Sequence, residues 1–238
     1  MITSDTMFQG KVTVLQRRDG YRFSIDAVLL AGLTNIRESD RVLDLGTGCG
    51  IVLLILAFRR RGAELVGIEI QSELAELARK NVQCNGWEPR IRILQMDFRE
   101  VAGHLPPRSF DVVVSNPPYR AVHMGRINPE PTRAVARHEL AASVGDVFKA
   151  ARHLLPTGGR LGLIYPAARL ARALVESEAH GFSPKELTVI HSRESAPGTL
   201  VHVEFRKGGG EELRIAPPFF IYEEQGAYTA KMRSLYEV

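Results

Sequence analysis

The sequence has little of several features that would place a protein in a particular class. It has only two cysteines, Cys49 and Cys84, in 238 residues. Two cysteines cannot supply a disulfide framework or a structural zinc site, and they suit a reducing compartment. No apolar run reaches the roughly 18 residues that a membrane-spanning helix needs, and residues 1–10 lack the pattern of a signal peptide. We therefore expect a soluble, cytoplasmic protein with no membrane partner.

A large excess of charge of one sign is also missing. Lys and Arg number 31 against 27 for Asp and Glu, a formal charge of +4. This balance permits a polyanionic partner without requiring one. Hydrophobic residues make up 45% and charged residues 24%, which excludes a disordered or fibrous chain. No repeat or linker divides the sequence, so we expect one domain over residues 1–238, with an N-terminal hairpin and helix in 1–39, a core in 40–206 and a packed tail in 207–238.

The hydrophobic pattern from residue 41 onward alternates between short apolar runs and amphipathic segments. It predicts strands at 42–45, 65–70, 91–96, 110–115 and 159–165, and helices at 51–60, 73–84, 98–103, 141–154 and 168–180. Such alternation is typical of a doubly wound α/β fold with a mostly parallel sheet. Two further strands at 187–191 and 200–205 predict an antiparallel terminal hairpin and bring the sheet to seven strands.

The first 40 residues follow a different pattern. Residues 11–23 read as a hairpin that turns at Asp19-Gly20, because Gly tolerates positive φ. A helix over 27–33 follows, and Ser24 or Asp26 can cap it.

A glycine-rich loop, Asp-Leu-Gly-Thr-Gly-Cys-Gly at residues 44–50, lies between the first core strand and its helix. Gly46, Gly48 and Gly50 recur at every second position, which does not match the spacing of dinucleotide binders, and no Lys-Ser or Lys-Thr pair completes a phosphate loop. Asp44 would repel a pyrophosphate and attract a cation. The alternative is that the loop is only a tight connection between two elements.

Two further acids end the next two strands. Glu69 is placed to accept hydrogen bonds from both hydroxyls of a ribose. Asp97 is suitably placed for an adenine amino group, and Phe98 could pack on the ring. Each acid alone could equally be a helix cap or a solvated charge. With the glycine spacing, the three acids resemble class I S-adenosylmethionine-dependent methyltransferases over most of residues 40–205, and the antiparallel strand at the end belongs to that fold too.

The sequence Asn116-Pro117-Pro118-Tyr119 follows the strand predicted at 110–115. The Asn116 side-chain oxygen and the Pro117 carbonyl can each accept one hydrogen of an adenine amino group, while the prolines stiffen the loop. Tyr119 can stack on the base, a contact worth roughly 1 to 3 kcal/mol. Catalysis is then mainly alignment and needs no metal or nucleophilic side chain. Alternatively, the prolines only end the strand and the aromatic ring only packs.

This motif resembles the amino-methyltransferases that modify exocyclic or amide nitrogens. Residues 20–31, residues 116–139 and the Ala-Tyr-Thr at 227–229 look like the tRNA(Val) adenine N6-methyltransferase family, which modifies an adenosine in the anticodon loop. The resemblance implies S-adenosylmethionine as cofactor, S-adenosylhomocysteine as product, and a catalytic set of Asn116, Pro117 and Tyr119. It implies a cofactor-binding set of Phe23, Asp26, Asp44, Gly46, Gly48, Glu69, Asp97, Phe98 and Asn116.

Cations gather in the long irregular stretch at 120–139. They are Arg120, His123, Arg126, Arg133 and Arg137, and they could hold RNA phosphates beside a flipped base. A solvated loop, balanced by Glu130 and Glu139, is the alternative.

The leading hypothesis is methyl transfer to the N6 of an adenine in RNA, in the anticodon loop of a tRNA, by a monomer or weak homodimer. A glutamine N5-methyltransferase of release factors is the first alternative, although that family carries a helical domain ahead of the glycine loop and only 43 residues precede Asp44 here. DNA or ribosomal RNA adenine methylation and a noncatalytic RNA-binding role are the others.

Overall fold

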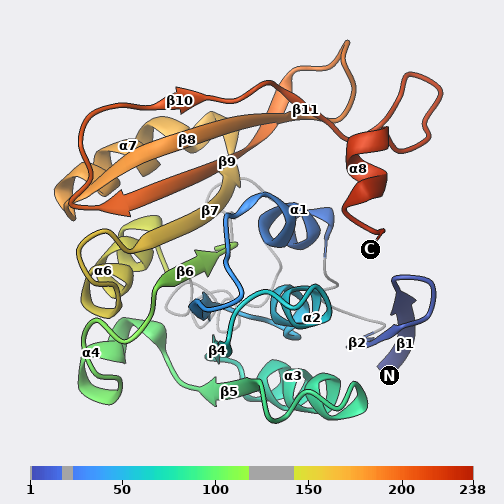
Figure 1. Ribbon diagram of the computed structural model, residues 1–238, viewed down its shortest axis with the longest axis horizontal. Helices are drawn as coiled ribbons and strands as arrows, with labels where there is room; N and C mark the ends of the chain where they lie inside the picture. The colour runs from blue at the N-terminus through green and yellow to red at the C-terminus, as the bar shows by residue number, and fades with distance from the viewer. Residues whose placement is uncertain (1, 18–23, 118–141, 238) are drawn as a thin grey trace, which may run out of the picture.

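The computed structural model describes residues 2–17, 24–117 and 142–237. Within them the chain forms a nine-stranded sheet with helices on both faces and a separate two-stranded hairpin (Figure 1). The sheet order is β10-β8-β9-β7-β6-β3-β4-β5, with β11 paired to β8. The doubly wound α/β fold predicted from the sequence is therefore confirmed.

The core strands follow the predicted segments closely. They are β3 (Arg41–Leu45), β4 (Glu64–Glu69), β5 (Ile91–Gln95), β6 (Val112–Ser115), β7 (Arg160–Pro166), β8 (Phe182–His191) and β9 (Gly198–Lys207). The five strands β3 to β7 pair in parallel, whereas β9 runs antiparallel between β7 and β8. These are the seven strands expected. The two-residue strands β10 (Arg214–Ile215) and β11 (Phe219–Phe220) extend the sheet beyond β8.

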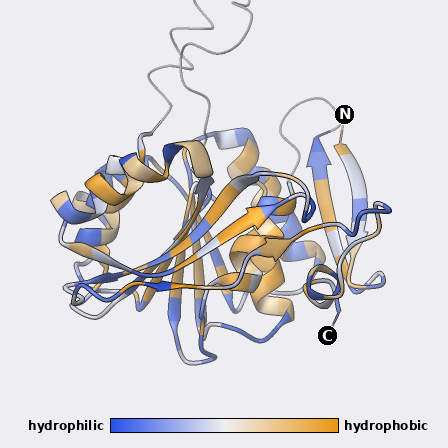
Figure 2. Cartoon of the chain, turned by 90° about the horizontal axis from the view of Figure 1, so that it is seen from above, coloured by the Kyte–Doolittle hydropathy of each residue, from blue (hydrophilic) through white to orange (hydrophobic). Residues whose placement is uncertain are grey.

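The helices divide between the two faces of the sheet because alternate strand residues point to opposite sides. Val42 and Val112 contribute to one buried cluster, whereas their neighbours Leu43 and Val113 contribute to the other. The first face is covered by α1 (Ile25–Leu33), α2 (Ile51–Phe58) and α3 (Ser72–Cys84), and the second by α4 (Val101–His104), α6 (Val144–Leu154) and α7 (Leu170–Ala179). Figure 2 shows hydrophobic residues along the central strands between these layers.

The N-terminal hairpin is present, but its two described strands are not the pair that the sequence suggested. Its strand near residues 11–16 exists as β2 (Val12–Arg17), but β2 pairs with the preceding β1 (Ile2–Met7), and Asp19-Gly20 lies outside the described residues. The real turn places Phe8 and Gln9 at φ values of 52° and 57°, a region that such residues seldom adopt. Burial of Phe8, whose ring stacks 4.4 Å from that of Phe58, compensates for this conformation.

The C-terminal residues lie against α1 and the edge of the sheet. The short helix α8 (Ala230–Ser234) is capped by Thr229, whose hydroxyl accepts a hydrogen bond from the Met232 amide. Leu235 packs against Gly32 of α1, and Arg59 donates to the Leu235 carbonyl. The division of the chain at residues 39 and 206 stays a prediction. Within residues 2–17, 24–117 and 142–237, none of the helices has the length and apolar character of a membrane span.

Candidate functional site

The carboxyl ends of four parallel strands bring the predicted site residues to one edge of the sheet. Leu45 of β3 pairs with Ile68 of β4 on one side and with Ser115 of β6 on the other. The Ser115 hydroxyl also donates to the Leu45 carbonyl at 2.9 Å. Asn116 is therefore the first residue after β6. Because β6 pairs with β3, Asn116 lies one strand away from the glycine loop that follows β3.

The glycine loop has a backbone that only glycine adopts easily. Gly46, Gly48 and Gly50 have φ values of 78°, 58° and 85°, which explains why the glycines alternate along the loop. The amides of Gly46 and Thr47 both donate to the Ile68 carbonyl at 2.9 Å. The loop is thus folded back onto the end of β4 before α2 begins.

Asp44 is a buried carboxylate immediately before this loop. It is 2% exposed, and its Oδ2 has no hydrogen-bond partner among the described residues. Burial raises the pKa of Asp44 to about 7, Thr47 opposes the shift, and the negative charge of Glu69 adds to it. Because a buried acceptor without a partner is costly, this oxygen indicates that a donor or cation belongs beside it.

Glu69 connects the glycine loop to the end of β4. Its Oε2 accepts a hydrogen bond from the Gly48 amide and its Oε1 accepts one from the Gln71 amide, each at 2.9 Å. The side chain is buried in the position that the sequence suggested, beside the loop. Each carboxylate oxygen has a second lone pair, so Glu69 can still accept from a ligand hydroxyl. Its contact with a ribose stays a prediction.

Asp97 follows β5 but is engaged locally. Its Oδ1 accepts from the Arg99 amide at 2.9 Å and caps a short 3-10 helix at Phe98–Glu100, while its Oδ2 accepts from Arg99 Nε at 2.8 Å. The hydrogen bond from Arg99 holds the pKa of Asp97 below its ordinary value. The helix-cap interpretation is thus realised, and its contact with an adenine, like that of Phe98, remains a prediction.

The remaining predicted residues divide into those that the structure describes and those that lie outside the described residues. Asp26 lies in the first turn of α1, where burial raises the pKa of its carboxyl and Ser24 opposes the shift. Asn116 is half-buried with an interaction partner, and Pro117 is buried. Outside the described residues lie Phe23, Tyr119, Arg120, His123, Arg126, Arg133 and Arg137.

Asn81 of α3 was not predicted as a site residue, yet its side chain is hydrogen-bonded to the glycine loop. Its side-chain amide donates to the Cys49 carbonyl at 2.9 Å and to the Leu15 carbonyl at 3.0 Å, and its oxygen accepts from the Leu15 amide. One fully buried asparagine therefore joins the loop, α3 and the hairpin. A polar residue on the apolar face of α3 is the signal that could have revealed it.

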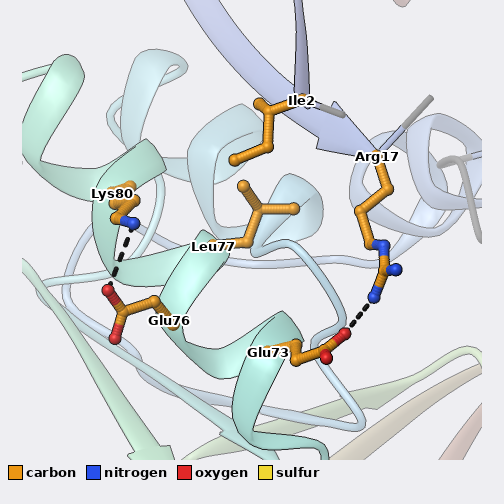
Figure 3. A pocket seen from close by; sticks show the side chains of 6 residues that line it. All are labelled: Ile2, Arg17, Glu73, Glu76, Leu77 and Lys80. Atoms are coloured by element: carbon orange, nitrogen blue, oxygen red, sulfur yellow. Dashed lines mark hydrogen bonds and ion pairs between the residues drawn. The ribbon is translucent and has the colours of Figure 1, made fainter.

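A surface hollow of about 250 Å³ between the hairpin and α3 is lined by none of the predicted site residues. In it Arg17 pairs with Glu73 and Lys80 pairs with Glu76 (Figure 3). The described residues also hold no group of three or more His, Cys, Asp or Glu arranged for a metal.

Comparison with known proteins identifies the family. Residues 25–178 match the family model described as methyltransferase small domain. The chain belongs to that family. A tRNA1(Val) (adenine(37)-N6)-methyltransferase from Bacteroides thetaiotaomicron is 32% identical over 83% of each chain, and one from Bacteroides fragilis is 28% identical over 98% of each. The resemblance noted in the sequence is confirmed.

A solved structure supports the same fold. It is described as a predicted O-methyltransferase, Atu636 from Agrobacterium tumefaciens, and it aligns with a TM-score of 0.72 and 27% identity over 89% of this chain and 95% of that one. Its architecture agrees with a methyltransferase fold for this chain.

Proposed function

We propose that this protein transfers a methyl group from S-adenosylmethionine to the N6 of an adenine in tRNA, in the anticodon loop. The observation that carries the proposal is the pairing of Leu45 with Ser115, which sets Asn116 and Pro117 beside the glycine loop. Membership of the methyltransferase family and the names of the relatives support it.

The residues at the sheet edge fit a cationic nucleoside ligand. Asp44 has a buried oxygen that a positively charged amino group would satisfy. Glu69 would accept hydrogen bonds from ribose hydroxyls, and Asp97 with Phe98 would receive the adenine end. When bound, S-adenosylmethionine supplies a methyl group activated by a positively charged sulfur. We extend this binding set to Phe23, Asp26, Gly46, Gly48 and Asn116.

Asn116 and Pro117 would hold the acceptor. An adenine amino group carries two hydrogens, and the loop offers two oxygens, one on the Asn116 side chain and one on the Pro117 backbone. Accepting both hydrogens would fix the nitrogen and point its lone pair at the methyl group. We propose that Tyr119 stacks on the base and that Arg120, His123, Arg126, Arg133 and Arg137 contact phosphates.

The arrangement favours an amino group over a hydroxyl as acceptor. A hydroxyl has one hydrogen to donate, so it would leave one of the two loop oxygens unused. The free-amide side chain of glutamine also carries two hydrogens, and this keeps protein N5-methylation as the second candidate.

Mass analysis of the methylated product distinguishes these acceptors. The protein is incubated with labelled S-adenosylmethionine and, in separate reactions, total tRNA, ribosomal RNA, DNA or a release factor. The account predicts N6-methyladenosine in the tRNA digest. Label on a release-factor glutamine, on a ribose oxygen or on DNA alone would contradict it. The cytoplasmic location and the monomeric or weakly dimeric state stay predictions.

A further inference from the structure

A second cluster of positive charge lies at the opposite edge of the sheet. It lines a hollow of about 530 Å³ bordered by Pro107, Arg108, Lys149, Arg152, His153, Thr157 and Lys207. Arg108 precedes β6, Thr157 precedes β7, and Lys207 ends the antiparallel β9. We call this set the basic hollow. It lies at the amino ends of the parallel strands, away from the glycine loop.

Local bonds account for part of this cluster. Lys207 Nζ donates to the carbonyls of Arg152 and Leu155 at 2.6 and 2.7 Å, where a cation favourably ends α6. His153 Nε2 lies 2.9 Å from the Leu105 carbonyl oxygen. The Arg108 amide donates to the His153 carbonyl at 3.0 Å, which fixes the loop against the helix end. Lys207 and His153 therefore have structural roles.

The other three cations have no such explanation. Arg108, Lys149 and Arg152 are exposed and form no ion pair with any described residue, and no carboxylate lines the hollow. Burial lowers the pKa of Lys207, and the positive charges of Arg108 and Arg152 lower it further. The hollow thus concentrates positive charge that the fold leaves uncompensated. In the hollow of Figure 3, by contrast, each cation has a carboxylate partner.

We propose that the basic hollow binds phosphates of the RNA substrate, at a distance from the base that is methylated. This inference rests on the proposed function. Helix α6 is capped by Ser143, which follows in sequence the segment that carries the predicted substrate residues, and its last turn holds Arg152 and His153. Its 11 residues span roughly 16 Å at about 1.5 Å each. A substrate that contacts both ends must reach at least that far over the surface, as a folded RNA does.

Neutralising the three exposed cations tests the proposal. The variant Arg108→Gln, Lys149→Gln, Arg152→Gln is compared with Lys80→Gln, Arg92→Gln, Arg172→Gln, which removes the same charge from cations paired with Glu76, Glu64 and Glu176. The first variant should bind full-length tRNA about tenfold or more weakly near 0.1 M salt and reduce the log-log salt slope by about 2 to 3. The control variant carries the same change in overall charge. Its affinity for tRNA should stay within about twofold of that of the parent.

Further measurements separate the possible failures. Affinity for S-adenosylmethionine and the melting temperature should be unchanged in both variants, and Arg108→Lys with Arg152→Lys should retain tRNA binding. Calorimetry with inorganic phosphate tests a free-anion site instead. Loss of phosphate binding without loss of tRNA binding, or an unchanged salt slope, would overturn the inference. If the parent methylated no RNA at all, the proposed function itself would fail.

Discussion

At the scale of single residues, Asp44 is the buried acid that we propose pairs with a positively charged ligand. A carboxylate that is buried without a partner for one oxygen destabilises the ionised form, and its pKa rises accordingly. The raised pKa means that Asp44 stabilises the ligand-free fold fully below its ordinary pKa of 3.8 and loses that contribution as pH rises through about 7. A positively charged ligand reverses this preference because it pairs with the ionised carboxylate.

Binding of S-adenosylmethionine should therefore strengthen as pH rises through the pKa of Asp44. Between pH 6 and pH 7.5 we expect the affinity to increase roughly fivefold to tenfold, because the ionised fraction of a group with a pKa of about 7 grows by that factor. Isothermal titration calorimetry at a series of pH values measures this affinity. Asp44→Asn should bind more weakly and lose the pH dependence, while exposed Glu38→Gln keeps it. A parent affinity that is flat over this range would argue against the pairing.

At the scale of elements, the hydrophobic pattern predicted those strands and helices that depend on residues close together in the sequence. The apolar runs of β3, β4 and β6 predicted the parallel core, and shared strand ends predicted that the glycine loop, Glu69 and Asn116 meet at one edge. The turn at Phe8 and Gln9 was missed because neither residue is a usual turn former. Strands β10 and β11 were missed because two residues carry no alternation.

The bonds that fix the site were not predictable in the same way. Ser115 reaches the Leu45 carbonyl across 70 positions of sequence, and Asn81 reaches Leu15 across 66. A single sequence shows the type of each residue but not its distant partner. The capping of the short 3-10 helix by Asp97, which accepts from the Arg99 amide two residues away, was among the alternatives because such contacts follow from spacing alone.

Asn81 of α3 and Asn85, which directly follows that helix, separate support of the fold from support of the loop. Asn81→Ala should lower the free energy of unfolding by about 2 to 4 kcal/mol, because it leaves buried backbone groups of β2 and the loop unpaired, and should weaken S-adenosylmethionine binding severalfold. Asn85→Ala removes the equivalent bonds to Thr13 but none to Cys49. Asn85→Ala should therefore lower the free energy of unfolding and leave the affinity for S-adenosylmethionine unchanged. Urea unfolding and calorimetry test the pair, and equal losses of affinity would refute a specific role for Asn81.

At the scale of the whole molecule, the sheet separates two functions between its edges. The carboxyl edge gathers the glycine loop, Glu69 and Asn116, whereas the amino edge carries the basic hollow. Helix α6 runs from the segment after β6 to that hollow. A substrate that contacts both edges would be recognised by its overall shape as well as by its target base, which suits a folded RNA.

The most direct test of the account is a separate measurement of catalysis and cofactor binding in Asn116→Ala. If Asn116 aligns the acceptor amine, kcat for methyl transfer to tRNA should fall at least about tenfold, the value of one aligning hydrogen bond of roughly 1 to 3 kcal/mol. The dissociation constant of S-adenosylmethionine should rise much less, by about threefold at most, because Asn116 is only one member of the binding set and Asp44 and Glu69 would still hold the cofactor. Undiminished transfer by Asn116→Ala would contradict the assignment of the site.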